Sequence, residues 1–364
     1  VGGYAFDDCS NLSKVVLSKN LETLSCGAFR NCDALTSIAI PKSLKNTDST
    51  YSQGPFYSCD NLTNVTFEAG ITVIAEDLFK GCGLERIVLP DTLTEIGYQA
   101  FDSCKKLQEI VIPDSVTKVG GYAFDDCSNL SKVVLSKNLE TLSSGAFRNC
   151  DALTSIAIPK SLRNTDSSYS QGPFYSCDNL TNVTFEAGIT IIPEGLFKGC
   201  GLKRITLPDT LTEIGYQTFD SCENLQEIVI PDSVTKIGGL AFRNCSKLSY
   251  VALPGSVKII AANAFQNCSA ELTFSCPLES IATIYAIDND IPFILSDTLS
   301  VDTSGMLDKG KNSYYADTNG IEVNGYVSMS LSYQAEEAQW NEARNKTIKI
   351  RIPKGTEVVE CSLK

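Results

Sequence analysis

Cysteine is the residue type in this chain that could do the most chemistry, because a thiolate can ligate a metal, attack a substrate or form a disulfide. Twelve of the 15 cysteines stand three residues after a phenylalanine. They are Cys9, Cys32, Cys59, Cys82, Cys104, Cys127, Cys150, Cys177, Cys200, Cys222, Cys245 and Cys268. Zinc sites typically use Cys-x-x-Cys pairs, and no such pair occurs here. We therefore predict neither a bound metal nor a cofactor.

Histidine is absent from all 364 residues, and the net charge is -13. Without histidine, neither a Ser-His-Asp nor a Cys-His nucleophile can be assembled, and a His-ligated metal site is excluded too. An enzyme would have to use carboxylates or tyrosine, as a glycoside hydrolase does. The acidic charge and the lack of a basic tract argue against nucleic acid as a partner. No apolar run is long enough to span a membrane.

The phenylalanines and cysteines belong to an internal repeat of 22 to 27 residues. After each cysteine comes a stretch such as "LQEIVIP" at 225–231, in which Ile228 and Ile230 alternate with outward-facing residues. This period of two predicts a short strand with one buried face, which the proline ends. A second short apolar pair follows, as in "SVTKIG" at 233–238. Each repeat is therefore predicted to be one coil of a solenoid, with its Leu, Ile, Phe and Cys side chains stacked on those of the next coil.

Within such a coil, the cysteine is a small buried residue at a tight corner, beside the phenylalanine that fills the centre. Adjacent coils lie ~4.8 Å apart, which is within the Cα separation of a disulfide. However, in-register side chains that point the same way rarely reach the disulfide dihedral angle of ~90°. We expect reduced core thiols, with some disulfides or a metal array as the alternatives. Cys26, Cys276 and Cys361 lie outside this ladder.

The segment "IPDSVTKIGGLAFRNCSKLSYVALP" at 230–254 closely resembles the repeat of the BspA-like bacterial leucine-rich-repeat surface proteins. The resemblance extends from residue 1 to about residue 295. It implies a repeat solenoid, a right-handed leucine-rich-repeat array of about twelve coils with a parallel β-sheet on its concave face. A parallel β-helix is the alternative fold, since it stacks coils of similar size. The resemblance also implies an exported or cell-surface protein that binds host proteins, matrix proteins or other cells.

A block of five coils is duplicated inside the array. Residues 1–118 match residues 119–236 at 107 of 118 positions. Two equivalent surfaces suit a long or bivalent binding face, because avidity can exceed each single affinity. Unequal recombination without a function is the alternative explanation. Differences such as Glu85 against Lys203 fall on the predicted surface.

Two columns of outward-facing residues are predicted along the strands. The candidates for protein binding in the first column are Arg86, Glu109, Lys132, Arg204, Glu227 and Tyr250. The second column is small and weakly apolar, and includes Val88 and Val111. The first column lacks the aromatic and arginine cluster that usually anchors a protein interface. It could equally be a solvated ladder in which neighbouring charges pair across strands.

The 27-residue coil supplies a second candidate surface. It has four extra residues within "NTDSTYSQGPF" at 46–56, and its copy is "NTDSSYSQGPF" at 164–174. Insertions in solenoids loop out on one face and are often the binding face. The candidate residues expected to be exposed on these loops are Tyr51, Gln53, Tyr169 and Gln171. A tolerated surface bulge is the alternative.

The repeat pattern changes near the C-terminus. Residues 278–295 have apolar residues at a helical spacing, such as Ile281 and Ile284, and we predict that they cap a solenoid that spans 1–295. In residues 296–364, the segments 325–334 and 346–363 alternate apolar and polar residues. They predict a small all-β domain, which we expect to be truncated. The first residue falls within a repeat, so we also expect the natural chain to extend further.

Together these features predict a non-enzymatic, secreted or cell-surface protein. We expect it to use an extended solenoid face for protein–protein recognition, or for adhesion to host or matrix components. A stiff stalk that presents other domains at the cell surface is the alternative function. The expected partner is a protein ligand, with neither nucleic acid nor a membrane span involved.

Overall fold

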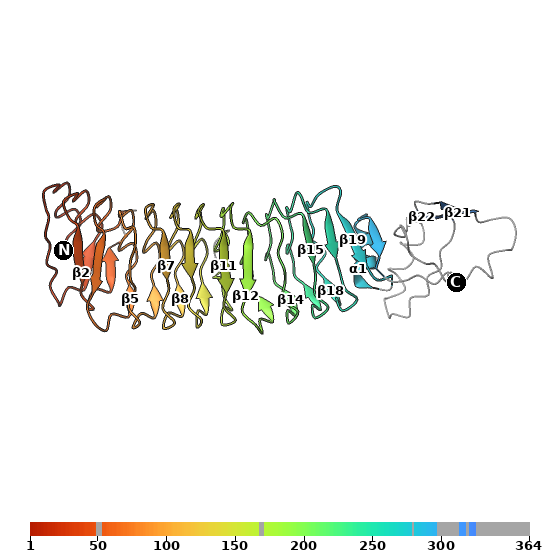
Figure 1. Cartoon of the computed structure of the whole chain (residues 1–364), viewed down its shortest axis with the longest axis horizontal. Coiled ribbons are helices and arrows are strands. Elements are labelled where there is room, and N and C mark those ends of the chain that lie inside the picture. Colours follow the sequence, from red (N-terminus) through yellow and green to blue (C-terminus); the bar gives the residue numbers. More distant parts are fainter. Residues whose placement is uncertain (49–52, 167–170, 279, 297–312, 318–319, 325–364) are drawn as a thin grey trace.

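The computed structural model describes residues 1–48, 53–166, 171–278, 280–296, 313–317 and 320–324. Up to residue 296, these residues form a parallel-strand β-solenoid of about 11 turns, which confirms the predicted leucine-rich-repeat array. Figure 1 shows the coils stacked along one long axis, with the N-terminus at one end. Most coils contribute two short strands, and these form two ladders along the stack.

The longer strands line one face, which we call the long-strand face. In β11 the side chains of Ile156 and Ile158 are buried, whereas the two alternate residues are exposed. Within each of the four sheets that the described residues form on this face, the strands pair in parallel, so that Glu109 lies opposite Lys132. The strands of this face are β2 (Ser37–Ile40), β4 (Asn64–Phe67), β7 (Glu109–Val111), β9 (Lys132–Val134), β11 (Ser155–Ile158), β12 (Asn182–Phe185), β15 (Glu227–Val229), β17 (Tyr250–Ala252), β19 (Thr273–Cys276) and β20 (Phe293–Leu295).

The second apolar pair of each repeat forms a ladder of shorter strands. It is interrupted between β3 and β5 and again between β10 and β13, where the 27-residue coils carry their extra residues. The strands of this ladder are β1 (Thr23–Ser25), β3 (Asn46–Asp48), β5 (Val73–Ile74), β6 (Glu95–Ile96), β8 (Lys118–Val119), β10 (Thr141–Leu142), β13 (Ile191–Ile192), β14 (Glu213–Ile214), β16 (Lys236–Ile237) and β18 (Ile259–Ile260).

Phenylalanine rings form a continuous stack through the centre of the solenoid. From Phe6 to Phe265, successive ring centroids are 5.0 to 6.3 Å apart and the rings are stacked. Phe124, for example, lies 5.1 Å from the ring before it and 5.1 Å from the ring after it. The repeated phenylalanine therefore fills the core of each coil and also joins it to both neighbours.

The ladder cysteines have a specific partner. The thiol of Cys127 donates to the carbonyl oxygen of Phe101 in the preceding coil at 3.2 Å, and the thiol of Cys150 donates to that of Phe124 at 3.3 Å. Cysteine thus combines a small apolar side chain with a weak S–H hydrogen-bond donor. Alanine, which is also small and apolar, has no such donor. Burial raises the pKa of the Cys59 thiol to about 12, because desolvation disfavours the thiolate. The cysteines in the described part of the chain are free thiols.

We expect Cys9 to react with iodoacetamide in the native protein much faster than the buried ladder thiols. Cys9 is exposed, whereas Cys59 and Cys127 are buried. A thiol with a pKa of about 12 is only ~0.01% ionised near pH 8. Mass spectrometry of the labelled peptides measures this difference, and labelling in denaturant should modify every cysteine. Rapid native labelling of Cys59 or Cys127 would contradict the burial of the ladder.

Helix α1 (Ile281–Asp288) lies at the C-terminal end of the stack, within the segment predicted to be a cap. The helix is shorter than that segment, because the chain then returns to the long-strand face as β20, which pairs with β19. The hydroxyl of Ser280 accepts from the backbone N–H of Thr283 at 3.2 Å and so caps the helix. No helix in the described residues is long and apolar enough to cross a bilayer.

Beyond residue 296, β21 (Ser313–Asp317) and β22 (Gly320–Asn324) pair as an antiparallel hairpin. The strands predicted at 325–334 and 346–363 lie outside the described residues. The division of the chain at residue 295 therefore stays a prediction.

Candidate functional site

The charged residues predicted in the first column pair with one another on the long-strand face. Nη1 of Arg86 is 3.3 Å from Oε1 of Glu109, and Nζ of Lys132 is 3.6 Å from the other oxygen of the same carboxylate. Arg86 and Lys132 are exposed and Glu109 is half-buried, so solvent screens these pairs and they add little stability. These residues place alternating charges along the surface.

A second group lies in the other half of the array. Nε of Arg204 is 3.2 Å from Oε1 of Glu227, and Tyr250 lies opposite Glu227 on the next strand. The six candidate residues of the first column therefore form two separate groups, related by a shift of 118 residues, instead of one cluster. The solvated ladder considered as an alternative describes the contacts of both groups.

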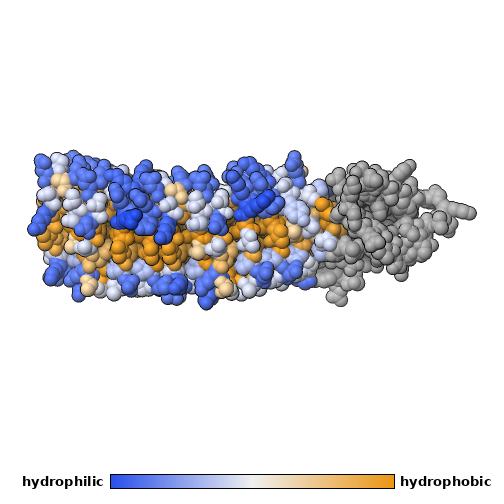
Figure 2. Space-filling view, viewed as in Figure 1, coloured by the Kyte–Doolittle hydropathy of each residue, from blue (hydrophilic) through white to orange (hydrophobic). Residues whose placement is uncertain are grey.

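An apolar column runs beside the charged one. Val88 is 84% exposed, Val111 54% and Val134 42%. Val111 and Val134 are paired in register, and Val88 belongs to the preceding coil. We call these three residues the valine stripe. Their counterparts 118 residues later in the chain are Thr206, Val229 and Ala252. Figure 2 shows apolar residues in a band that follows the long axis of the solenoid.

The two glutamines predicted to be exposed on the inserted loops are instead half-buried. Oε1 of Gln171 accepts hydrogen bonds from the Tyr122 hydroxyl at 3.2 Å and from Nη1 of Arg148 at 3.1 Å. Oε1 of Gln53 accepts from the Tyr4 hydroxyl at 3.4 Å in the first block. The glutamines differ from the prediction because they hold one end of each loop to the neighbouring coils. Tyr51 and Tyr169 lie outside the described residues.

Aromatic and ionic contacts hold in place the two residues that bind Gln171, Tyr122 and Arg148. The guanidinium of Arg148 lies 4.9 Å from the centroid of the Tyr122 ring, and its Nε donates to Asp125 at 2.8 Å. Gly145 lies beneath the tyrosine with a φ of +64°, and a Cβ there would be 2.6 Å from the ring. Glycine is therefore required at this position, both for the left-handed backbone and for the close approach of the ring.

A third column, which we did not predict from the sequence, consists of the residue that follows each repeat phenylalanine. We call it the corner column. Its charged members pair between adjacent coils, as Asp7 does with Arg30 at 2.6 Å and Asp220 with Arg243 at 2.5 Å. The sequence signal was an acid and a base at the same repeat position one coil apart. Asp220 is fully buried, so this column is far less solvated than the first.

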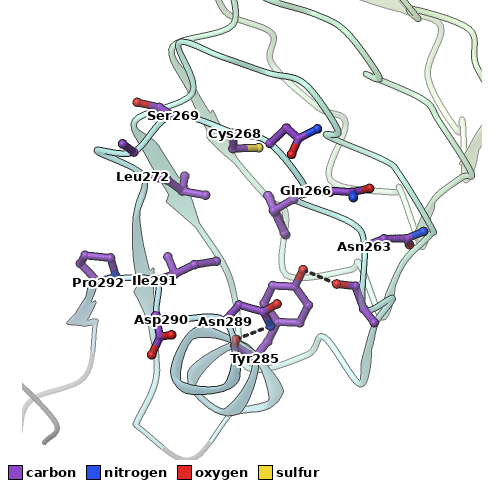
Figure 3. A pocket seen from close by; sticks show the side chains of 14 residues that line it. Asn263, Gln266, Cys268, Ser269, Leu272, Tyr285, Asn289, Asp290, Ile291 and Pro292 are labelled. Carbon is purple, nitrogen blue, oxygen red and sulfur yellow. Dashed lines mark hydrogen bonds between the residues drawn. The ribbon is translucent and has the colours of Figure 1, made fainter.

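Figure 3 shows a pocket of about 420 Å³ between the last coil and helix α1. The hydroxyl of Tyr285 donates to the carbonyl oxygen of Ala262 at 3.1 Å. Through this hydrogen bond, helix α1 contacts the last coil of the stack. Burial raises the pKa of the Cys268 thiol in this pocket to about 12, and the lining contains one carboxylate, Asp290. The pocket therefore offers neither a ready nucleophile nor a pair of carboxylates.

The parallel coils, the central stack of phenylalanine rings and the extended long-strand face define the protein as a leucine-rich-repeat β-solenoid. The family model described as "BspA type Leucine rich repeat region (6 copies)" matches residues 1–53, 49–172 and 167–288. The chain therefore belongs to the BspA-type leucine-rich-repeat family, as its repeat sequence predicted.

Solved structures of bacterial leucine-rich-repeat proteins are similar to this chain. One from Bacteroides ovatus shares 25% identity at a TM-score of 0.46, covering 76% of this chain and 87% of its own. A leucine-rich cell surface protein from Faecalibacterium prausnitzii shares 23% identity at a TM-score of 0.38, covering 74% and 82%. One from Eubacterium ventriosum shares 21% identity at a TM-score of 0.43, covering 67% and 80%. Among curated proteins, no relative matches the chain.

Proposed function

We propose that this protein is a non-enzymatic binding protein that recognises a protein partner through the long-strand face. The contact is centred on the valine stripe and on the paired charges of Arg86, Glu109 and Lys132 beside it. Arg204, Glu227 and Tyr250, each 118 residues later in the chain, form the corresponding contact, beside a column that is less apolar. The family to which the chain belongs supports recognition as its general role.

The observation that carries this proposal is the exposure of valines at the same repeat position of three successive coils. A contiguous apolar patch that is rimmed by polar residues marks an interaction site more often than an isolated apolar residue does. The charges beside the stripe already pair with one another, and they supply the polar rim that an interface needs. About 11 turns spaced by ~4.8 Å give a face ~50 Å long, which is ample for an interface of ~800 Å² per partner.

The test is a binding screen of the full chain against matrix and host surface proteins by surface plasmon resonance. For any partner found, Val111→Glu is expected to raise the Kd at least ~10-fold, since a buried charge without a partner is costly at an interface. Val229→Glu makes the same change at the same repeat position of the second block, and we expect a smaller effect. Equal increases in Kd for the two variants would contradict a binding site centred on the valine stripe.

The inserted loops form the second part of the proposal. We propose that Tyr51 and Tyr169 form a separate contact on loops that Gln53 and Gln171 anchor, and that the protein acts outside the cell or at its surface. Shortening both loops to the standard coil length tests this part. Loss of binding in that variant, with Val111→Glu still binding, would place the contact on the loops. Failure of the native chain to bind any partner would favour the alternative function, a stiff stalk that presents other domains.

A further inference from the structure

A buried lysine lies between two buried carboxyl groups at the corner of the fourth repeat. Lys80, in the corner column, is 7% exposed, Asp77 is 3% exposed and Asp102 is 6% exposed. Nζ of Lys80 is 2.9 Å from Oδ2 of Asp102 and 3.6 Å from Oδ1 of Asp77. That Asp77 oxygen has no hydrogen-bond partner among the described residues. The amine of Lys80 is thus held against one carboxyl group while a second carboxyl group faces it.

The second carboxyl group is suited to carry a proton. Burial raises the pKa of Asp77 to about 6, because desolvation disfavours its carboxylate more than the charge of Lys80 favours it. A group with a pKa near neutrality can both accept and donate a proton under physiological conditions. In addition, a buried ion pair carries a large desolvation penalty, which disappears if the two charged groups become one neutral amide.

We propose that Lys80 and Asp102 form an intramolecular isopeptide bond, with Asp77 as the proton carrier. One proton passes from the Lys80 ammonium to the Asp102 carboxylate, and the neutral amine then attacks Cγ of Asp102. A second proton passes from the nitrogen to Asp77 and from there to Oδ2, which leaves as water. One N–C bond forms, one C–O bond breaks, the positive and the negative charge cancel, and Asp77 returns to its starting state.

Two neighbouring side chains position the reacting carboxyl group. The hydroxyl of Ser103 donates to Oδ1 of Asp102 at 2.8 Å, the oxygen that bears negative charge in the tetrahedral intermediate. The amide of Gln99 donates to Oδ2 at 2.8 Å. These hydrogen bonds fix the carboxyl plane relative to the lysine, so the reaction starts from a single oriented arrangement.

The second block contains a natural counterpart that lacks this arrangement. Lys198 matches Lys80, and its Nζ is 3.3 Å from Oδ2 of Asp220. However, Gly195 replaces Asp77, so the proton carrier is missing. Arg243 also holds both oxygens of Asp220, at 2.9 and 2.5 Å. The same chain therefore presents a reactive and an unreactive version of one corner.

The bond would join two adjacent coils through their side chains. Lys80 and Asp102 are 22 residues apart, so the cross-link closes one complete coil and restricts the unfolded chain in the same way as a disulfide. Unlike a disulfide, an amide resists reduction, and its formation needs no oxidant.

Intact-mass spectrometry of the full chain under denaturing and reducing conditions tests the proposal. The expected mass is lower than the sequence mass by one water molecule. Digestion should yield a branched peptide that joins the segments containing Lys80 and Asp102. A protein whose intact mass equals the sequence mass, with no branched peptide, would overturn the proposal.

Matched variants assign the roles of the residues. Lys80→Arg should restore the full sequence mass, whereas Lys198→Arg should keep the loss of one water. Asp77→Gly, which installs the residue of the second block, should slow cross-linking at least ~100-fold, the usual contribution of a positioned proton carrier. Cross-linking at an unchanged rate in Asp77→Gly would overturn the role of Asp77, and a branched peptide at Lys198 would overturn the requirement for it.

Discussion

Replacing Phe124 with alanine is expected to lower the free energy of unfolding by about 3–5 kcal/mol. Its ring is fully buried and stacks at 5.1 Å on Phe101 and at 5.1 Å on Phe147. The substitution removes the apolar surface of the ring and leaves a cavity between two coils. Because each coil of a solenoid contacts its immediate neighbours, that cavity weakens both inter-coil contacts. Denaturant unfolding followed by circular dichroism measures the loss.

Phe6→Ala is the matched control for this prediction. Phe6 occupies the same repeat position, but its side chain is 42% exposed and it stacks on Phe29 alone in the described residues. We expect a loss less than half as large, because less apolar surface leaves water and no enclosed cavity forms. Equal losses for the two variants would show that the aromatic stack does not carry the stability of the array.

Asp220→Ala is expected to cost about 3 kcal/mol or more of unfolding free energy. The carboxylate is fully buried and faces Nζ of Lys198 at 3.3 Å and Nη2 of Arg243 at 2.5 Å. Alanine would leave two cations at a largely buried corner without their counter-charge, which costs more than the ion pairs themselves contribute. Thermal and denaturant unfolding at neutral pH would measure the change.

Glu213→Ala provides the comparison. Glu213 forms an ion pair of similar length with Lys236, at 2.7 Å, yet both side chains are more than a third exposed. Water and salt screen such a pair, so we expect a small loss of stability. Comparing the two variants shows whether the burial of an ion pair, and not its length, determines the loss of unfolding free energy. Comparable losses would contradict the conclusion that burial makes the Asp220 corner important for stability.

Much of the fold follows from the sequence because the pattern repeats. The alternation of Ile156 and Ile158 with exposed residues predicts the strand and its buried face, and the recurrence of the phenylalanine and cysteine predicts the stack. The charged column was predictable for the same reason, since residues at one repeat position become neighbours one coil apart. The duplication places Arg86 and Arg204 in equivalent surroundings, so two groups of candidates were also foreseeable.

What the sequence alone determined about this protein is its periodicity: a solenoid of leucine-rich coils, an inward and an outward side for each strand, and a block copied once. The tertiary structure decided which polar groups meet at the corners. Gln171 lies 49 residues from the Tyr122 hydroxyl that it binds, and the half-burial of that glutamine depends on how the longer coil joins its neighbours. No sequence pattern distinguishes Lys80 and Asp77 from the other charged residues, and the packed corner buries both. Burial and side-chain partnership arise from the stacking of whole coils, so a pattern within one coil cannot reveal them.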